Sequence, residues 1–327
     1  MIAATGVSGG PFERNGNLAN DFDILHEDLW AGMDTYEKAH RVLLEEAIKT
    51  ALHKGKIQKE KVKFLFAGDL INQITPTSFA AKTMQTPYFG LFGACSTSME
   101  GLALASFVIN YQGADYVLTG ASSHNAAVEK QFRYPTEYGG QKPPTAQWTV
   151  TGAGVALLCQ NDPSENHPVT VSATIGKVID MGLSDPHNMG GAMAPAAADT
   201  IMAHFRDLQL DPSYYDLIVT GDLGRIGQEA TFELIQNSGL KMEREKFQDC
   251  GLMIYKDEQP VLAGASGAGC SAIVLYGHLL NQMKKGVYKR ILVVATGALF
   301  SPLTFQQNET IPCIAHAVAI EANGEKG

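Results

Sequence analysis

The sequence lacks the features of several protein classes. Only 18% of its 327 residues are charged, and 34 Asp and Glu outnumber 25 Lys and Arg. A formal net charge of -9 without any Lys/Arg cluster gives no surface for nucleic acid. No apolar run reaches the ~18 residues that span a bilayer, and the first residues do not have the pattern of a signal peptide. We therefore expect no nucleic-acid partner, no signal peptide and no transmembrane segment.

Cysteine is also scarce. The five cysteines form an odd set without a Cys-x-x-Cys spacing: Cys95, Cys159, Cys250, Cys270 and Cys313. This pattern argues against a disulfide framework and against a zinc site, so we predict a reducing compartment, no metal and no cofactor. Apolar residues, in contrast, make up 45% of the chain, enough for one large domain or two of ordinary size.

Three segments occur twice along the chain, in the same order. The first pair are apolar strands that end in Gly-Asp-Leu, the second are small-residue turns with a cysteine, and the third are apolar runs with Thr-Gly-Ala or a close variant. They are Phe64 to Leu70 with Leu217 to Leu223, Gly93 to Ser96 with Gly267 to Ser271, and Val117 to Ala121 with Val294 to Ala298. Three matches in register indicate a duplicated unit. We predict two similar halves, residues 1–165 and 166–327.

Within each half, short apolar runs alternate with helical patterns, which predicts an α/β fold. Runs such as Tyr215 to Thr220 and Arg290 to Ala295 are typical of strands that are buried on both faces. A capping box at Asp34 to Glu37 begins a helix that Gly55 ends. The helices after Cys95 and Cys270 are unusually apolar, so we place them between two sheets, in five layers α-β-α-β-α.

Cys95 lies in the sequence Gly93-Ala94-Cys95-Ser96, between the apolar run Tyr88 to Phe92 and a helical stretch. We interpret this as a turn from a buried strand into a helix, where the first backbone N–H groups lower the pKa of a thiol or hold an anion. His124 follows a strand of the same half and is the one candidate base. The favoured alternative is that His124 is hydrogen-bonded at the strand end.

At these residues the chain resembles the thiolase-like superfamily, through its duplication, its cysteine turn and the turn Gly264 to Gly269. Longer segments resemble the stage V sporulation AD family of endospore-forming bacteria: Gly93 to Glu100, Ser122 to Ala126, Gln131 to Lys142 and Ala192 to Asp199. The chain begins later than that family's members, so the resemblance implies a first strand that is shortened or lost.

The resemblance also implies that catalysis is lost. Condensing enzymes of the superfamily place a His after the strand that matches Leu217 to Thr220, and an Asn or His in the turn that matches Gly264 to Ser266. Here those positions hold Gly221-Asp222 and Ala265, which supply neither that base nor an oxyanion-hole donor. The loop that carries the acid of thiolases corresponds to Thr296 to Pro302, which has no thiol.

Family resemblance therefore implies a non-catalytic protein that binds dipicolinic acid, or calcium dipicolinate, for uptake into the developing spore. We expect ligand contacts from Cys95, Ser96, His124, Arg133 and Lys142, a homodimer, and a peripheral position at the forespore or spore inner membrane with other SpoVA membrane proteins. The alternatives are a Cys95-dependent acyltransferase with non-standard partners, or a structural subunit.

Two further segments look like long loops. Lys130 to Pro144, which holds Arg133 and Lys142, is aromatic and lines either the ligand site or a dimer contact. Gly182 to Asp199 is similar in character, and we expect its methionines to fill gaps in the packing rather than to contact a ligand.

Overall fold

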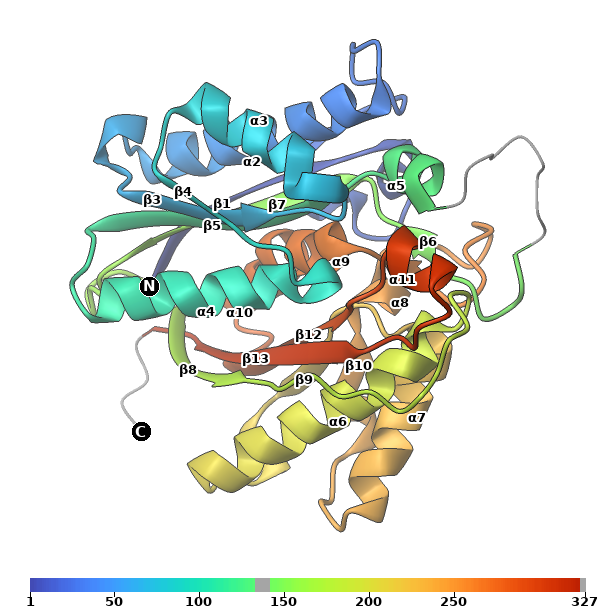
Figure 1. Ribbon diagram of the computed structural model, residues 1–327. Helices are drawn as coiled ribbons and strands as arrows, with labels where there is room; N and C mark the ends of the chain where they lie inside the picture. Colours follow the sequence, from blue (N-terminus) through green and yellow to red (C-terminus); the bar gives the residue numbers. More distant parts are fainter. Residues whose placement is uncertain (133–141, 324–327) are drawn as a thin grey trace.

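The computed structural model describes residues 1–132 and 142–323. Two sheets pack face to face, with helices between them and on both outer surfaces (Figure 1). The prediction of an α/β fold in five layers, α-β-α-β-α, is confirmed. The central strands of each sheet are buried on both faces, which is why runs such as Leu217 to Thr220 and Ile291 to Ala295 are apolar.

The first sheet has six strands, and β7 runs antiparallel to its two neighbours. In spatial order they are β2 (Ile24–Leu25), β1 (Ile2–Gly9), β7 (Gly152–Cys159), β5 (Tyr116–Ser123), β3 (Phe64–Gly68) and β4 (Tyr88–Gly90). β1 is a full strand of eight residues paired with β7 along its length. The expectation that the first strand is shortened or lost is therefore wrong.

The second sheet repeats this arrangement with five strands. Their order is β10 (Phe247–Asp249), β9 (Leu217–Thr220), β12 (Arg290–Ala298), β13 (Cys313–Glu321) and β8 (Val169–Ile175). The duplicated apolar segments thus form β3 and β5 in one sheet and β9 and β12 in the other, at equivalent places. The division into residues 1–165 and 166–327 as domains stays a prediction.

Two helical segments fill the space between the sheets. α4 (Thr97–Asn110) contacts strands of both sheets, and beside it lies a continuous helix made of α9 (Ala268–Ile273), the π-helical η8 (Val274–Leu279) and α10 (Leu280–Lys284). The packing here is tight, because a Cβ at Gly154 of β7 would lie 2.5 Å from the carbonyl carbon of Ala272. These are the two apolar helices that we placed in the middle layer.

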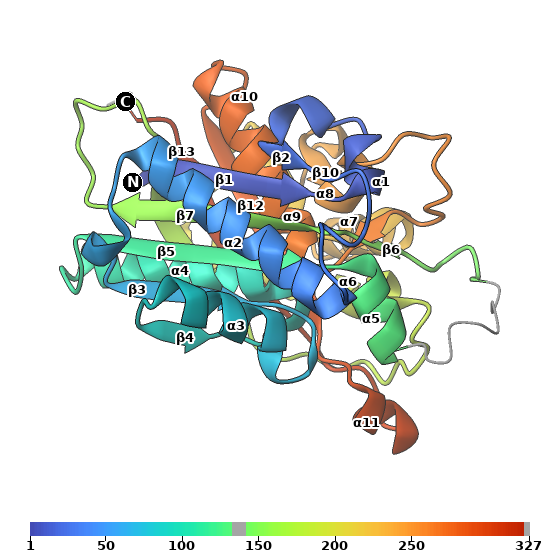
Figure 2. The same ribbon diagram turned by 90° about the horizontal axis from the view of Figure 1, so that it is seen from above.

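Four longer helices cover the outer faces: α2 (Tyr36–Gly55) and α3 (Thr75–Met84) on the first sheet, α6 (Met189–Leu208) and α7 (Gly224–Asn237) on the second. Figure 2 shows α2 lying across β1, β7 and β5. Its N-cap is Thr35, whose hydroxyl oxygen accepts from the N–H of Lys38. The predicted capping box at Asp34 to Glu37 is therefore one residue out of place.

Shorter elements connect these layers. They are α1 (Pro11–Arg14), η1 (Ala19–Asp21), η2 (Lys59–Lys61), η3 (Asn72–Ile74), η4 (Ala94–Ser96), α5 (Asn125–Phe132), η6 (Pro212–Tyr214), η7 (Arg244–Lys246), α8 (Cys250–Met253), α11 (Pro302–Gln306), and the parallel pair β6 (Trp148–Thr149) and β11 (Ala265–Ser266). Among the helices of the described residues, none is both long and apolar enough to cross a membrane.

Two further expectations are corrected by the fold. The strand before Cys95 is not buried: β4 is the edge of the first sheet, with Phe89 51% and Phe92 57% exposed. The segment Gly182 to Asp199 is only partly a loop, because α6 begins at Met189, where the side chain of Asn188 caps it. Pro195 sits inside that helix without ending it.

Candidate functional site

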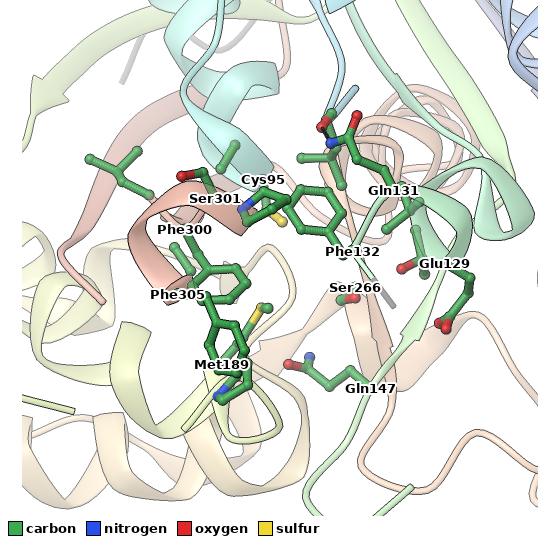
Figure 3. Close-up of a pocket in the computed structure, with 18 of the residues that line it drawn as sticks. Cys95, Glu129, Gln131, Phe132, Gln147, Met189, Ser266, Phe300, Ser301 and Phe305 are labelled. Carbon is green, nitrogen blue, oxygen red and sulfur yellow. Dashed lines mark hydrogen bonds between the residues drawn. The ribbon is translucent and has the colours of Figure 1, made fainter. Parts of the chain in front are cut away.

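A cavity of about 830 Å³ opens between α5 and α11, at the end of the sheets where Cys95 lies. Figure 3 shows Cys95 beside Phe132, with Phe300, Phe305, Ser266 and Gln147 on the same cavity. The rings of Phe132 and Phe300 are stacked, with centroids 6.2 Å apart. A large, mainly apolar space with a few polar groups is the usual form of a small-molecule site.

Cys95 reaches this cavity from a strained turn. Ala94 has a φ of 51°, in the left-handed region that residues with a Cβ rarely adopt. The backbone N–H and the hydroxyl of Ser96 both donate to the carbonyl of Gly93, at 3.1 and 2.7 Å. A Cβ at Gly297 of β12 would lie only 2.3 Å from that same carbonyl, so β12 packs directly onto the turn.

This packing corrects the predicted anion site at the start of α4. The N–H of Thr97 is bonded to the carbonyl of Ala94, and the N–H of Ser96 to that of Gly93. Ser96 itself is fully buried and is not among the residues that line the cavity. The N–H groups of Ser96 and Thr97 are therefore engaged within the turn itself and are not available to a ligand.

Asp222 is the partner of the Cys95 thiol. The Asp222 carboxyl group lies beside the Cys95 thiol and accepts from the N–H of Gly267 at 2.9 Å and from the hydroxyl of Thr296 at 3.1 Å. Burial raises the pKa of Asp222 to about 7. Burial, and then the neighbouring Asp222, raise the pKa of Cys95 well above its ordinary value, so the thiol stays protonated.

The described lining of the cavity contains one carboxyl group and no Lys or Arg. That carboxyl group belongs to Glu129, whose oxygen accepts a hydrogen bond from Nζ of Lys142 at 2.9 Å. Lys142 also lies over the ring of Trp148, 4.9 Å from its centroid. Lys142 is thus close to the cavity through Glu129 without lining it. Arg133 lies outside the described residues.

His124 does not reach the cavity. Its Nε2 bonds to the carbonyl of Leu29 at 2.8 Å, and its ring lies beside those of Tyr36 and His40, on the face of the first sheet that α2 covers. Burial, followed by the effect of His40, lowers the pKa of His124 to about 4. We therefore correct the expectation of a ligand contact: His124 is a buried, neutral side chain at a strand end, as the favoured alternative stated.

Several cavity residues were missed by sequence reasoning. Gln147 donates through Nε2 to the carbonyls of Asp222 and Ala265, at 2.6 and 2.9 Å, which leaves its Oε1 for other partners. His187 lines the cavity, and its Nδ1 has no hydrogen-bond partner among the described residues. Met189 and Phe300 are also on the wall. The sequence holds a signal only for Asp222, the neighbour of Cys95: it stands in a Gly-Asp-Leu segment after an apolar run, and that segment occurs in both halves.

The sequence matches the family described as Stage V sporulation protein AD over residues 1–321. It is 46% identical over 324 residues to Stage V sporulation protein AD of Bacillus subtilis (strain 168), which covers 99% of this chain and 95% of that protein.

Among solved structures, 3-oxoacyl-[acyl-carrier-protein] synthase III from Aquifex aeolicus VF5 is similar, with a TM-score of 0.64, 14% identity, and 98% and 99% of the two chains covered. A variant of OleA from Xanthomonas campestris has the same TM-score with 15% identity, covering 98% of this chain and 97% of that one. At such low identity these two likenesses show the fold alone, which is thiolase-like.

Proposed function

Since this chain belongs to the stage V sporulation protein AD family, we propose that it binds dipicolinic acid, alone or as the calcium chelate, in the cavity at Cys95. In this proposal it catalyses no reaction and serves the uptake of the ligand into the developing spore. The chain is a sporulation protein on a thiolase-like fold; the ligand and its uptake are the part that we add.

The observation that carries the non-catalytic part is the contact between Cys95 and Asp222. A cysteine nucleophile needs a base or a positive neighbour that favours the thiolate. Here the neighbour is a buried carboxyl group, which raises the pKa of Cys95 further. Since the thiol stays protonated, Cys95 lines the cavity without acting as a nucleophile.

The cavity suits a small aromatic acid. A pyridine ring could stack on Phe132 and Phe300, because offset aromatic pairs are favoured at the ring separations found here. Hydroxyl groups of Ser266 and Thr149 and the Nδ1 atom of His187 are on the same lining and can bond carboxylate oxygens. The volume of about 830 Å³ exceeds what one such molecule fills, which leaves room for water or a metal ion.

Charge decides between the free acid and its chelate. Dipicolinate carries two negative charges, and Lys142, the lysine that contacts the cavity residue Glu129, is already paired with it. Binding of the dianion therefore requires that Lys142 turn to the ligand or that Arg133 take part. Calcium dipicolinate is neutral and needs neither, and the carboxyl group of Glu129 and Oε1 of Gln147 are oxygen atoms of the type that calcium prefers.

The purified protein should not become acylated. We expect no mass increase on Cys95 after incubation with acetyl-CoA or an acyl carrier protein thioester at pH 7, because its thiol is protonated. Intact-protein and peptide mass spectrometry measure this directly. Stoichiometric acylation of Cys95, lost in Cys95→Ala and followed by turnover, would replace the binding function by the enzymatic one.

An acyltransferase is the second candidate, and one observation favours it: a mainly apolar cavity ends at a thiol whose neighbour, Asp222, has a pKa near 7. A carboxylate with that pKa can accept a proton at neutral pH. In such an enzyme Asp222→Asn would abolish acylation of Cys95. If the protein only binds a ligand, Cys95 is acylated neither in the parent nor in Asp222→Asn.

We also propose a position at the inner membrane of the forespore and spore, through other SpoVA membrane proteins. What supports this is the family together with the lack of a spanning helix among the described residues, which leaves protein contacts as the means of attachment.

We propose that the homodimer forms through the edge of the first sheet. The edge strand β4 has unpaired backbone groups and exposed Phe89 and Phe92, and the ring of Phe89 stacks on Phe66 at 4.8 Å. Two copies can pair this edge about a two-fold axis. We expect a dimer by light scattering at micromolar concentration, and a monomer for Phe89→Glu. Leu234→Glu, on α7, should stay dimeric; a parent protein that is monomeric would remove the proposal.

A further inference from the structure

A second pocket, of about 260 Å³, lies where β1, the segment before α2, the end of α2 and helix α10 meet. Among the described residues, none lines both this pocket and the cavity at Cys95. Nine of its twelve lining residues are polar: Thr5, Asn20, Asp21, Asp23, Lys54, His167, Tyr276, Asn281 and Lys284. A polar recess of this kind differs in chemistry from the aromatic cavity.

Both carboxyl groups of this pocket already have partners. Asp21 accepts from Nδ1 of His278 at 2.7 Å and from Nδ2 of Asn281 at 3.2 Å. Asp23 accepts from the N–H of Val7 at 2.9 Å and pairs with Nζ of Lys54 at 2.5 Å. These oxygens are therefore engaged and are not free to ligate a metal ion.

The unmatched groups of the pocket are donors or can become donors. Lys284 has no ion pair or hydrogen bond from its side chain within the part of the chain that the structure describes. Partial burial, and then the positive charge of Lys54, lower its pKa. Nδ1 of His167 and the hydroxyl group of Tyr276 also lack a hydrogen-bond partner among the described residues.

We propose that this pocket binds a small molecule through an oxyanion group, a phosphate or a carboxylate, held by Lys284 with Lys54 beside it. Two ammonium groups that face one recess repel each other, and although Asp23 attracts both, Lys284 forms no ion pair or hydrogen bond with it in the described part of the protein. An anion between them removes that repulsion and gives Lys284 a charge-assisted partner. The volume is larger than a single phosphate group needs, so the ligand has room for a small organic part.

Calorimetric titration of the full chain at constant ionic strength tests this, with inorganic phosphate and acetate as the probes. We expect one saturable site, weakened at least tenfold by Lys284→Met. Lys285→Met is the matched control, because Lys285 is the next residue of the same helix end, is exposed as Lys284 is, and does not line the pocket. It should bind as the parent does.

Differential labelling gives a second measurement that needs no variant. An amine-reactive reagent, followed by mass spectrometry, should label Lys284 less in saturating phosphate or acetate, with Lys285 unchanged. Saturation by phosphate alone identifies a phosphate ligand, and saturation by acetate identifies a carboxylate. If neither phosphate nor acetate saturates a site, or if Lys284→Met and Lys285→Met lose affinity equally, the proposal is overturned. Neither result depends on dipicolinate or on Cys95.

Discussion

Replacing Asp222 by Asn should make the free energy of unfolding less sensitive to pH between pH 5 and pH 8. Asp222 is 1% exposed, and burial raises its pKa from 3.8 to about 7. Since the folded state holds this proton more tightly than the unfolded chain, the contribution to stability is fully present below about pH 4. It is lost as the pH rises through about 7.

The size of the effect follows from the two pKa values. Each pH unit between them changes the stability by about 1.4 kcal/mol, so the interval from pH 5 to pH 7 corresponds to at most about 3 kcal/mol. From pH 5 to pH 7 the unfolding free energy of the parent should fall by up to this amount relative to that of Asp222→Asn. Chemical unfolding at a series of pH values measures it.

The other titrating groups are common to both proteins, so their contributions cancel in the difference between the two unfolding free energies. Burial lowers the pKa of His40 to about 3 and of His204 to about 4, so these side chains cost stability as the pH falls below about 6.5. Asp162→Asn is the control. Asp162 is exposed and its pKa is lowered, so it stays charged throughout this range and its replacement should not change the pH dependence. A parent-to-variant difference that is the same at pH 5 and pH 8 would show that Asp222 is not a buried acid.

The layers of the fold could be predicted because periodicity and duplication are properties of neighbouring residues. Runs such as Arg290 to Ala295 are apolar on both faces, and this pattern specifies a covered strand wherever it occurs. The edge of a sheet leaves no such mark. Phe89 and Phe92 look like core residues in the sequence, yet Phe89 lies on β4 and Phe92 just after it, and β4 has a neighbour on one side only.

The candidate site was harder to predict, because its members come from segments far apart in the sequence. Cys95 was identified from its turn, but its partner Asp222 follows a strand of the other half, and we compared that position only with the residues that condensing enzymes use. The sequence places His124 at the end of a strand in the same half as Cys95, which favours a position at the cavity. The side of the sheet to which it turns depends on packing against Tyr36 and His40, which no local pattern records.

Dipicolinate should stabilise the protein against heat, through charged residues at the cavity. At about 100 times its Kd a ligand adds roughly 2.7 kcal/mol to the stability, visible as a higher Tm. Lys142→Ala should reduce the rise, because the dianion loses the cation that contacts the cavity residue Glu129. Lys130→Ala is the matched control, because Nζ of Lys130 pairs with Glu37 at 2.8 Å and Lys130 does not line the cavity. Arg133→Ala tests the remaining predicted contact.

Glu129→Gln separates recognition of charge from a general loss of structure. Glu129 supplies the one carboxyl group of the described lining and holds Lys142. Its replacement removes a repulsion and releases a cation, so the dianion should bind more tightly, a gain that damage to the fold cannot produce. If the calcium chelate is the ligand, the same variant should bind it less well, because calcium loses a carboxylate oxygen. Benzoate, with a single carboxylate, measures simple filling of the aromatic cavity. If dipicolinate and benzoate raise the Tm equally, dipicolinate is not the ligand. The same follows if dipicolinate leaves the Tm unchanged both with and without calcium.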